Sequence, residues 1–253
     1  MGPNCLGIIV PGLRLSASFA AGMPQPGRVA LLSQSGALCT AILDWAIERQ
    51  IGFSAFVSAG NMLDVSMGDL IDYLAADPRT ESLILYIESL SHARDFLSAA
   101  RAFARYKPIV AYEAGRFAES AQAAASHTGA LAGVDAVYEA AFRRAGIERV
   151  FSVDDMFDSA ELLARQRPPR GPRLAIVTNA GGPGVMATDV LMEQRGQLAK
   201  LSAPTMQRLN QALPPHWSHN NPVDVLGDAT PGGMRPRWKP CSPTTEWMPR
   251  SSS

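Results

Sequence analysis

From residue 28 to residue 165 the chain alternates between short apolar runs and longer segments with helical periodicity. Each apolar run is too continuous to leave one face in water, and in most cases the next segment carries apolar residues three or four positions apart. Strands that are buried on both faces and separated by helices form parallel sheets with helices on either side. The pattern therefore predicts a doubly wound, flavodoxin-like α/β domain over residues 24–166. Its strand-like runs include RVALLS, FSAFVS, SLILYIE and PIVAYEA.

The proline-rich segment RQRPPRGPR, residues 165–173, predicts a linker, and the alternation restarts after it. The strand-like runs LAIVTN and QLAKLS, each followed by a helical segment, predict a second flavodoxin-like domain over residues 167–231. Two parallel strands cannot bury the helices that they carry, so we expect this domain to be incomplete.

The last segment, residues 232–253, contains four prolines and two tryptophans and has neither a helical nor a strand period. We interpret it as an anomalous tail, produced by a shift of reading frame or by truncation. Re-reading the coding sequence after Pro231 in the other frames tests this interpretation.

Composition excludes several classes of partner and site. The chain has 23 basic and 23 acidic side chains, which gives no electrostatic reason to expect nucleic acid or an anionic membrane. The sequence contains no run of 18 apolar residues, so it predicts no membrane-spanning helix. The three cysteines are far apart and odd in number, so we expect a reducing, cytoplasmic environment rather than disulfides.

Two small-residue turns follow strand-like runs, where parallel sheets bind ligands. The first, SQSGAL, contains Ser33, Ser35 and Gly36. Free N–H groups at the start of the next helix would attract an anion, although an ordinary serine cap with a glycine turn explains the same letters. The second, TNAGGPGV, brings Gly181, Gly182 and Gly184 together, and it matches neither a dinucleotide fingerprint nor a P-loop.

One histidine, His127, lies in a run of small residues, AAASHTGALAG. It is either a loop histidine without a function or a functional residue. A functional imidazole needs a partner that fixes its tautomer. Glu88 is the best candidate because it ends the run LILYIE and so lies at the carboxyl edge of the predicted sheet. His216 and His219 form an H-x-x-H pair without a third ligand nearby, and we expect no metal site.

Taken in order, GPNCLG, SQSGAL, YIES, SHTGALAG, TNAGGPGV and NPVDV resemble the NDP-forming acyl-CoA synthetases, which are relatives of succinyl-CoA synthetase and include ADP-forming acetate–CoA ligase. The resemblance covers about residues 1–231. It implies an acid–thiol ligase in which acyl-CoA, phosphate and ADP interconvert with acid, CoA and ATP through an acyl phosphate and a phosphohistidine.

The resemblance also assigns roles to individual residues. His127 matches the phosphorylated histidine, and Glu88 matches the carboxylate that orients its imidazole. Two turns match the phosphate-binding helix N-termini, and the segment at the start of the chain matches the CoA and acyl site. These residues are Ser33, Ser35 and Gly36 for the first turn, Gly181, Gly182 and Gly184 for the second, and Asn4 and Cys5 for the CoA and acyl site.

The chain departs from the family in its extent. The CoA-binding Rossmann domain is represented only by residues 1–23, interpreted as its remnant, and the ATP-grasp domain that binds the nucleotide is absent. The resemblance implies CoA and ATP or ADP with Mg²⁺ as cofactors, with the nucleotide site on another chain or domain. We therefore expect an oligomer or a partner chain, and no complete catalytic cycle from this chain alone.

Two other functions remain open at this stage. A closely similar region occurs in proteins fused to a GNAT acetyltransferase domain, where it can act as a ligand-sensing regulatory region. The segments YIESL and SAARAFARYKPIV look more like those fusions, whereas His127 favours catalysis. The third interpretation is an inactive fragment of a broken gene.

Overall fold

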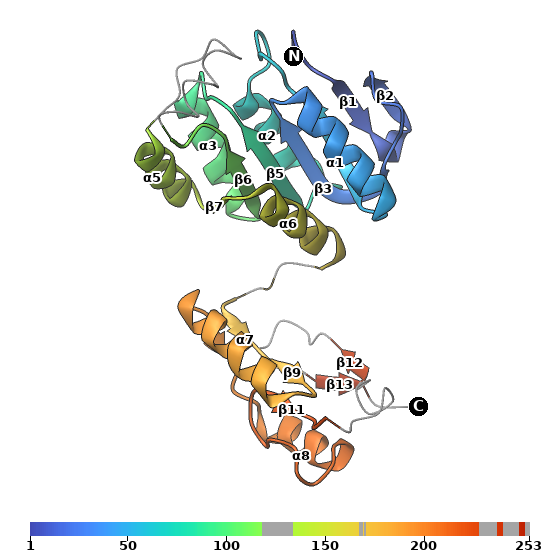
Figure 1. The fold of residues 1–253 in the computed structure, drawn as a ribbon, viewed down its shortest axis with the longest axis vertical. Helices are drawn as coiled ribbons and strands as arrows, with labels where there is room; N and C mark the ends of the chain where they lie inside the picture. Colours follow the sequence, from blue (N-terminus) through green and yellow to red (C-terminus); the bar gives the residue numbers. More distant parts are fainter. Residues whose placement is uncertain (118–133, 167–168, 170, 228–236, 240–247, 251–253) are drawn as a thin grey trace. The chain divides into compact units, whose positions relative to one another are not determined.

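The computed structural model describes residues 1–117, 134–166, 169, 171–227, 237–239 and 248–250 (Figure 1). The chain forms two compact units, Met1–Pro168 and Pro169–Ser253. They divide inside the proline-rich segment that the sequence predicts to be a linker. No helix among the described residues is long and apolar enough to span a membrane.

The first unit is built on a seven-stranded sheet in the order β2-β1-β4-β3-β5-β6-β7. The five strands from β4 to β7 are parallel, and their order is the flavodoxin-like one. This confirms the fold class predicted from the alternation of apolar runs and helical segments. The strands are β1 (Gly7–Val10), β2 (Leu15–Ser18), β3 (Gln25–Ser33), β4 (Gly52–Ser58), β5 (Ser82–Ile87), β6 (Ile109–Glu113) and β7 (Ile147–Val150).

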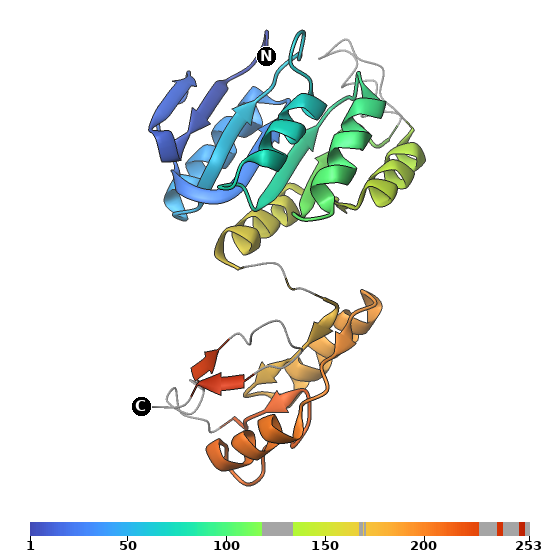
Figure 2. The same cartoon turned by 180° about the vertical axis from the view of Figure 1, so that it is seen from behind.

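Helices cover both faces of this sheet. Helices α1 and α6 pack on one face, and α2, α3 and α5 pack on the other, as the opposite views in Figures 1 and 2 show. Their apolar stripes bury two separate cores against the sheet, which is why the central strands β3, β4, β5 and β6 are apolar on both sides. The helices are α1 (Gly36–Glu48), α2 (Met67–Ala76), α3 (Ala93–Ala104), α5 (Asp135–Ala145) and α6 (Val153–Arg165), with a short 3₁₀ helix η1 (Pro11–Leu13).

The start of the chain adds two strands that the sequence pattern did not predict. Strand β1 pairs antiparallel with β4, and β2 pairs antiparallel with β1, so both belong to the sheet of the first unit. The pattern missed β2 because its four residues, LSAS, are mostly exposed and form too short a run to indicate a strand. The interpretation of residues 1–23 as the remnant of a CoA-binding domain stays a prediction.

Between residues 171 and 227, the described part of the second unit contains four two-residue strands and two helices. The strands pair in parallel as two separate ribbons, β8 with β10 and β9 with β11. The sequence predicted one strand over LAIVTN, which the structure divides into β8 and β9, and it missed β11 in NPVDV. The elements are β8 (Arg173–Leu174), β9 (Val177–Thr178), α7 (Gly181–Glu193), β10 (Gln197–Leu198), α8 (Ala203–Ala212) and β11 (Val223–Asp224).

Within the tail, β12 (Arg237–Lys239) and β13 (Met248–Arg250) pair antiparallel. The periodicity of the sequence indicated no strand in this segment. The origin of the tail in a shifted frame or a truncation stays a prediction.

Candidate functional site

The turn after β3 lies at the carboxyl edge of the sheet, where it starts α1. Ser35 is the N-cap of α1, and its Oγ accepts a hydrogen bond from the Leu38 N–H at 3.2 Å. The N–H groups of Gly36 and Ala37 come in the first turn of the helix, where no intrahelical acceptor exists. They are therefore the donors that this turn can offer to an anion.

The buried hydroxyl of Ser33 stabilises the turn through the backbone of Ser35. This hydroxyl accepts from Ser35 N–H at 3.1 Å and donates to Ser35 O at 3.0 Å, and the residue is completely buried. The hydroxyls of Ser33 and Ser58 also form hydrogen bonds with the thiol of Cys39. Burial raises the pKa of this thiol to about 11. The structure thus gives Ser33 a place inside the fold, whereas Ser35 and Gly36 are partly exposed at the rim.

The first residues of the chain lie along the same edge. Leu6 N–H donates to Ser58 Oγ at 2.9 Å, and Asn61 N–H donates to Pro3 O at 3.0 Å. Gly60 has a φ of +60°, and a Cβ there would lie 2.4 Å from Pro3 O, so only glycine permits this approach. These contacts hold Asn4, which is exposed, and Cys5, a half-buried free thiol, beside the end of β4.

Glu88 follows the end of β5 and is half-buried at this edge. Its negative charge contributes, after burial, to raising the pKa of Tyr86 to about 12, with a smaller contribution from Tyr112. The rings of Tyr86 and Tyr112 stack with centroids 5.6 Å apart. The structure therefore brings Glu88 to the same edge as the Ser35 turn, as the sequence predicted from parallel-strand geometry.

His127 lies outside the described residues, so the pairing of its imidazole with Glu88 stays a prediction. The described chain stops at Phe117 and resumes at Val134. The residues on either side are joined, because Arg116 Nε donates to Asp135 Oδ1 at 3.3 Å.

Arg149 is a second buried feature of this edge that the sequence analysis did not single out. Its Nη2 donates to Glu113 at 2.7 Å and to Asp135 at 2.5 Å, and its Nη1 donates to Glu139 at 3.4 Å. Burial raises the pKa of Glu113 although Arg149 opposes the shift, whereas the hydrogen bond from Arg149 lowers the pKa of Asp135. The sequence feature that could have indicated this residue is the presence of an arginine in the short strand IERV, which is otherwise half apolar.

In the second unit the predicted glycine turn is the first turn of α7. The N-cap of that helix is Ala180, which has no side-chain cap, and Gly181 is the first helical residue. A Cβ on Gly181 would lie 3.1 Å from Asp224 Oδ2, and one on Gly184 would lie 3.0 Å from Thr178 Cγ2. These two glycines permit close packing, whereas Gly182 has open space around it.

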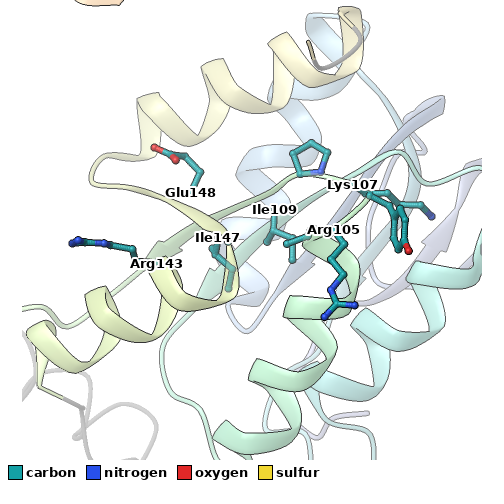
Figure 3. Close-up of a pocket in the computed structure, with 10 residues that line it drawn as sticks. Arg105, Lys107, Ile109, Arg143, Ile147 and Glu148 are labelled. Carbon is teal, nitrogen blue, oxygen red and sulfur yellow. The ribbon is translucent and has the colours of Figure 1, made fainter. Parts of the chain in front are cut away.

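A surface pocket of about 550 Å³ lies at the opposite, amino edge of β6 and β7 (Figure 3). Arg105, Lys107 and Arg143 line it, but their side chains point in different directions. The Nζ of Lys107 donates to the Ala75 and Asp77 carbonyls at 2.9 Å and to the Leu74 carbonyl at 3.3 Å. The charge of Lys107 is thus directed at the carboxyl end of α2. The basic side chains that line the pocket therefore do not converge on a common point inside it.

This geometry predicts a structural role for Lys107. In Lys107→Met we expect the free energy of unfolding to fall by about 1–2 kcal/mol, because three carbonyls at the negative end of α2 lose their donor. Urea denaturation of the full chain measures the change, with Arg94→Met on the exposed face of α3 as the control. Equal stability of the two variants would contradict the role.

Among the residues that the structure describes, no group of three or more His, Cys, Asp or Glu side chains could hold a metal ion. His216 and His219 are both exposed. The His219 ring is hydrogen-bonded to Asn210 Oδ1 and to Pro215 O, each at 2.9 Å. Its ring nitrogens are therefore already engaged within the second unit.

Residues 26–163 match the family of succinyl-CoA ligase like flavodoxin domains. The chain belongs to this family. The match covers the parallel part of the sheet, its helices, the Ser35 turn and Glu88.

Relatives extend the similarity over nine-tenths of the chain. It is 43% identical to an ADP-forming acetate–CoA ligase I of Archaeoglobus fulgidus, over 91% of this chain and 33% of the relative. It is 40% identical to the alpha subunit of ADP-forming acetate–CoA ligase I of Pyrococcus furiosus, over 90% of this chain and 49% of that subunit. The chain thus spans between a third and a half of these relatives.

A solved structure shows the same fold. The dinucleotide-forming acetyl-coenzyme A synthetase 1 of Candidatus Korarchaeum cryptofilum, in complex with phosphate and ADP, superposes with a TM-score of 0.82 at 38% identity. The similarity covers 90% of this chain and 49% of that one.

Proposed function

We propose that this chain is the phosphohistidine-bearing core of an ADP-forming acyl-CoA synthetase, with His127 as the phosphorylated residue. The observation that carries the proposal is the meeting of the Ser35 turn and Glu88 at one edge of a sheet of this family. The sequence similarity to ADP-forming acetate–CoA ligases over nine-tenths of the chain supports it.

The proposed step transfers a phosphoryl group from an acyl phosphate to His127. An imidazole nitrogen attacks phosphorus, the bond between phosphorus and the acyl oxygen breaks, and the carboxylate leaves with the electron pair. The nitrogen–phosphorus bond forms, and the imidazole must be oriented with its lone pair toward phosphorus. Glu88 would fix that orientation by accepting a hydrogen bond from the other ring nitrogen.

Helix N-termini would stabilise the charge of the transferring group. The N–H groups of Gly36 and Ala37 can bind phosphate oxygens at the start of α1 without a lysine or an arginine. The turn at Gly181, Gly182 and Gly184 starts α7 and is the proposed second phosphate-binding turn. Because backbone N–H groups bind the phosphate in this assignment, it does not require an excess of basic side chains, and the chain has none.

The remaining substrates bind partly or wholly outside this chain in the proposal. Acyl-CoA would present its thioester near Asn4 and Cys5, which lie at the same edge as the Ser35 turn. ATP or ADP with Mg²⁺ would bind an ATP-grasp domain or subunit, and the chain would work in an assembly with it. The limited share of the relatives that the chain spans is consistent with this division.

Phosphorylation of His127 is directly measurable. After incubation of the full chain with acetyl phosphate and Mg²⁺, we expect its intact mass to increase by one acid-labile phosphate. His127→Ala should take up none, because the nucleophile is gone, and the exposed His216→Ala should behave like the parent.

Circular dichroism on each sample separates folding from chemistry. A folded parent chain that gains no phosphate would contradict the proposal, as would acid-stable phosphate or equal labelling of His127→Ala. Coupled assays with ATP, CoA and acetate should give acetyl-CoA only when an ATP-grasp partner is supplied.

A further inference from the structure

The side chain of Gln34 joins the two halves of the candidate site. Its Oε1 accepts hydrogen bonds from Glu88 N–H at 2.5 Å and from Ser89 N–H at 3.0 Å. Its Nε2 donates to Ser89 O at 2.9 Å. One amide therefore makes three hydrogen bonds to two consecutive residues that follow β5.

The backbone of Gln34 reinforces this connection. Its N–H donates to Tyr86 O at 3.2 Å, so the residue is bonded to the chain on both sides of Ile87. Gln34 is only 8% exposed, which shields these bonds from competition with water. Because Gln34 lies between Ser33 and the N-cap Ser35, any shift of the α1 turn is passed to the segment that carries Glu88.

A side-chain amide is the group that suits this place. Glu88 and Ser89 offer two N–H donors and one carbonyl acceptor, and glutamine supplies one acceptor oxygen and one donor nitrogen. A carboxylate would meet the Ser89 carbonyl with a negative charge, and an apolar side chain would leave three backbone groups without partners.

We propose that Gln34 is a positioning residue that fixes the Glu88 carboxylate relative to the phosphate-binding N-terminus of α1. The role in phosphoryl transfer rests on the function proposed above. Gln34 touches neither phosphate nor imidazole in this role. It acts through the backbone of Glu88.

Amide hydrogen exchange tests the positioning independently of any activity. In Gln34→Met, which keeps the length of the side chain, we expect the Glu88 and Ser89 amides to exchange about five- to tenfold faster than in the parent. The amides within β3 and β5 should stay protected, and the exposed Gln25→Met should match the parent throughout. Unchanged exchange at Glu88 and Ser89 would overturn the proposed attachment.

Phosphorylation kinetics test the consequence. We expect Gln34→Met to lower the rate of His127 labelling by acetyl phosphate by about tenfold or more, because the orienting carboxylate is displaced. Faster exchange at Glu88 with an unchanged labelling rate would overturn the positioning role. An unlabelled parent would contradict the proposed function, and the exchange measurement would still decide whether Gln34 fixes Glu88.

Gln34→Glu provides a rescue that a merely structural role would not produce. The introduced carboxyl, when protonated, has a donor for Ser89 O and an acceptor for the two N–H groups, so it replaces the amide. We expect its labelling rate, relative to the parent at the same pH, to rise as the pH falls through the pKa of that carboxyl. Gln34→Met should show no such recovery, and a pH-independent ratio for Gln34→Glu would overturn the role.

Discussion

Replacing Arg149 by methionine is expected to lower the free energy of unfolding of the first unit by about 3–5 kcal/mol. The guanidinium lies 2.7 Å from Glu113, whose exposed fraction is 2%. Methionine fills part of the space but removes the guanidinium that is hydrogen-bonded to this buried carboxylate. Breaking a buried pair on one side costs more than the pair contributes, because the remaining charge stays desolvated.

The size of this loss depends on pH in a defined direction. Burial already raises the pKa of Glu113 in the folded state, and Arg149 opposes the rise most, with a smaller contribution from the charge of Arg116. Without Arg149 the folded pKa rises further above the unfolded value of about 4.3. The difference in stability between variant and parent should therefore be small near pH 4 and grow as the pH rises through the folded pKa of Glu113.

Urea denaturation of parent and variant at several pH values measures this dependence. Arg165→Met is the control, because Arg165 pairs with Glu161 at the surface at 2.8 Å and its removal should cost less than about 1 kcal/mol. The double variant Arg149→Met with Glu113→Gln should recover part of the loss at neutral pH. A pH-independent loss would show that packing, rather than the buried charge, explains the effect of Arg149→Met.

The strands and helices of the first unit from β3 to α6 were predictable because their signals are local. Apolar runs such as SLILYIE identify a strand that is buried on both faces, and Ser35 and Ser152 mark helix starts by their side chains. The convergence of the Ser35 turn and Glu88 followed from one rule, since parallel strands bring their carboxyl ends to the same edge.

The connections within the site were not predictable, because they join residues that are distant in sequence. Gln34 bonds to Glu88 across 54 positions, and Arg149 bonds to Glu113 across 36. Neither pairing leaves a periodic trace. Strand β11 of the second unit escaped prediction for another reason, since its two residues, Val223–Asp224, are too few to show alternation.

The second unit depends on a small core, and this makes Trp217 its most sensitive position. Among the described residues, the buried cluster of this unit consists of Leu209, Leu213, Trp217, Val223 and Val225. The indole of Trp217 is 1% exposed. The indole N–H also donates to Asn210 Oδ1 at 3.0 Å. Removing the largest member of such a cluster opens a cavity that the few remaining side chains cannot fill.

In Trp217→Ala we therefore expect the second unit to lose about 3–5 kcal/mol, which is comparable to the whole stability of a small core. Hydrogen exchange measured by mass spectrometry should show that α7 and α8 lose protection while β3, β5 and β6 keep theirs. The separate cores of the two units are the reason for this selectivity.

His219→Ala is the matched control for Trp217→Ala. Its imidazole contacts the indole with ring centroids 4.7 Å apart but is exposed, so its loss should leave α8 protected. Loss of protection in both units of Trp217→Ala would mean that they unfold together, and the first unit would then draw stability from the second. Protection confined to the first unit would instead show that the sheet carrying Gln34, Glu88 and Arg149 is stable by itself, so that variants at its edge report on the site directly.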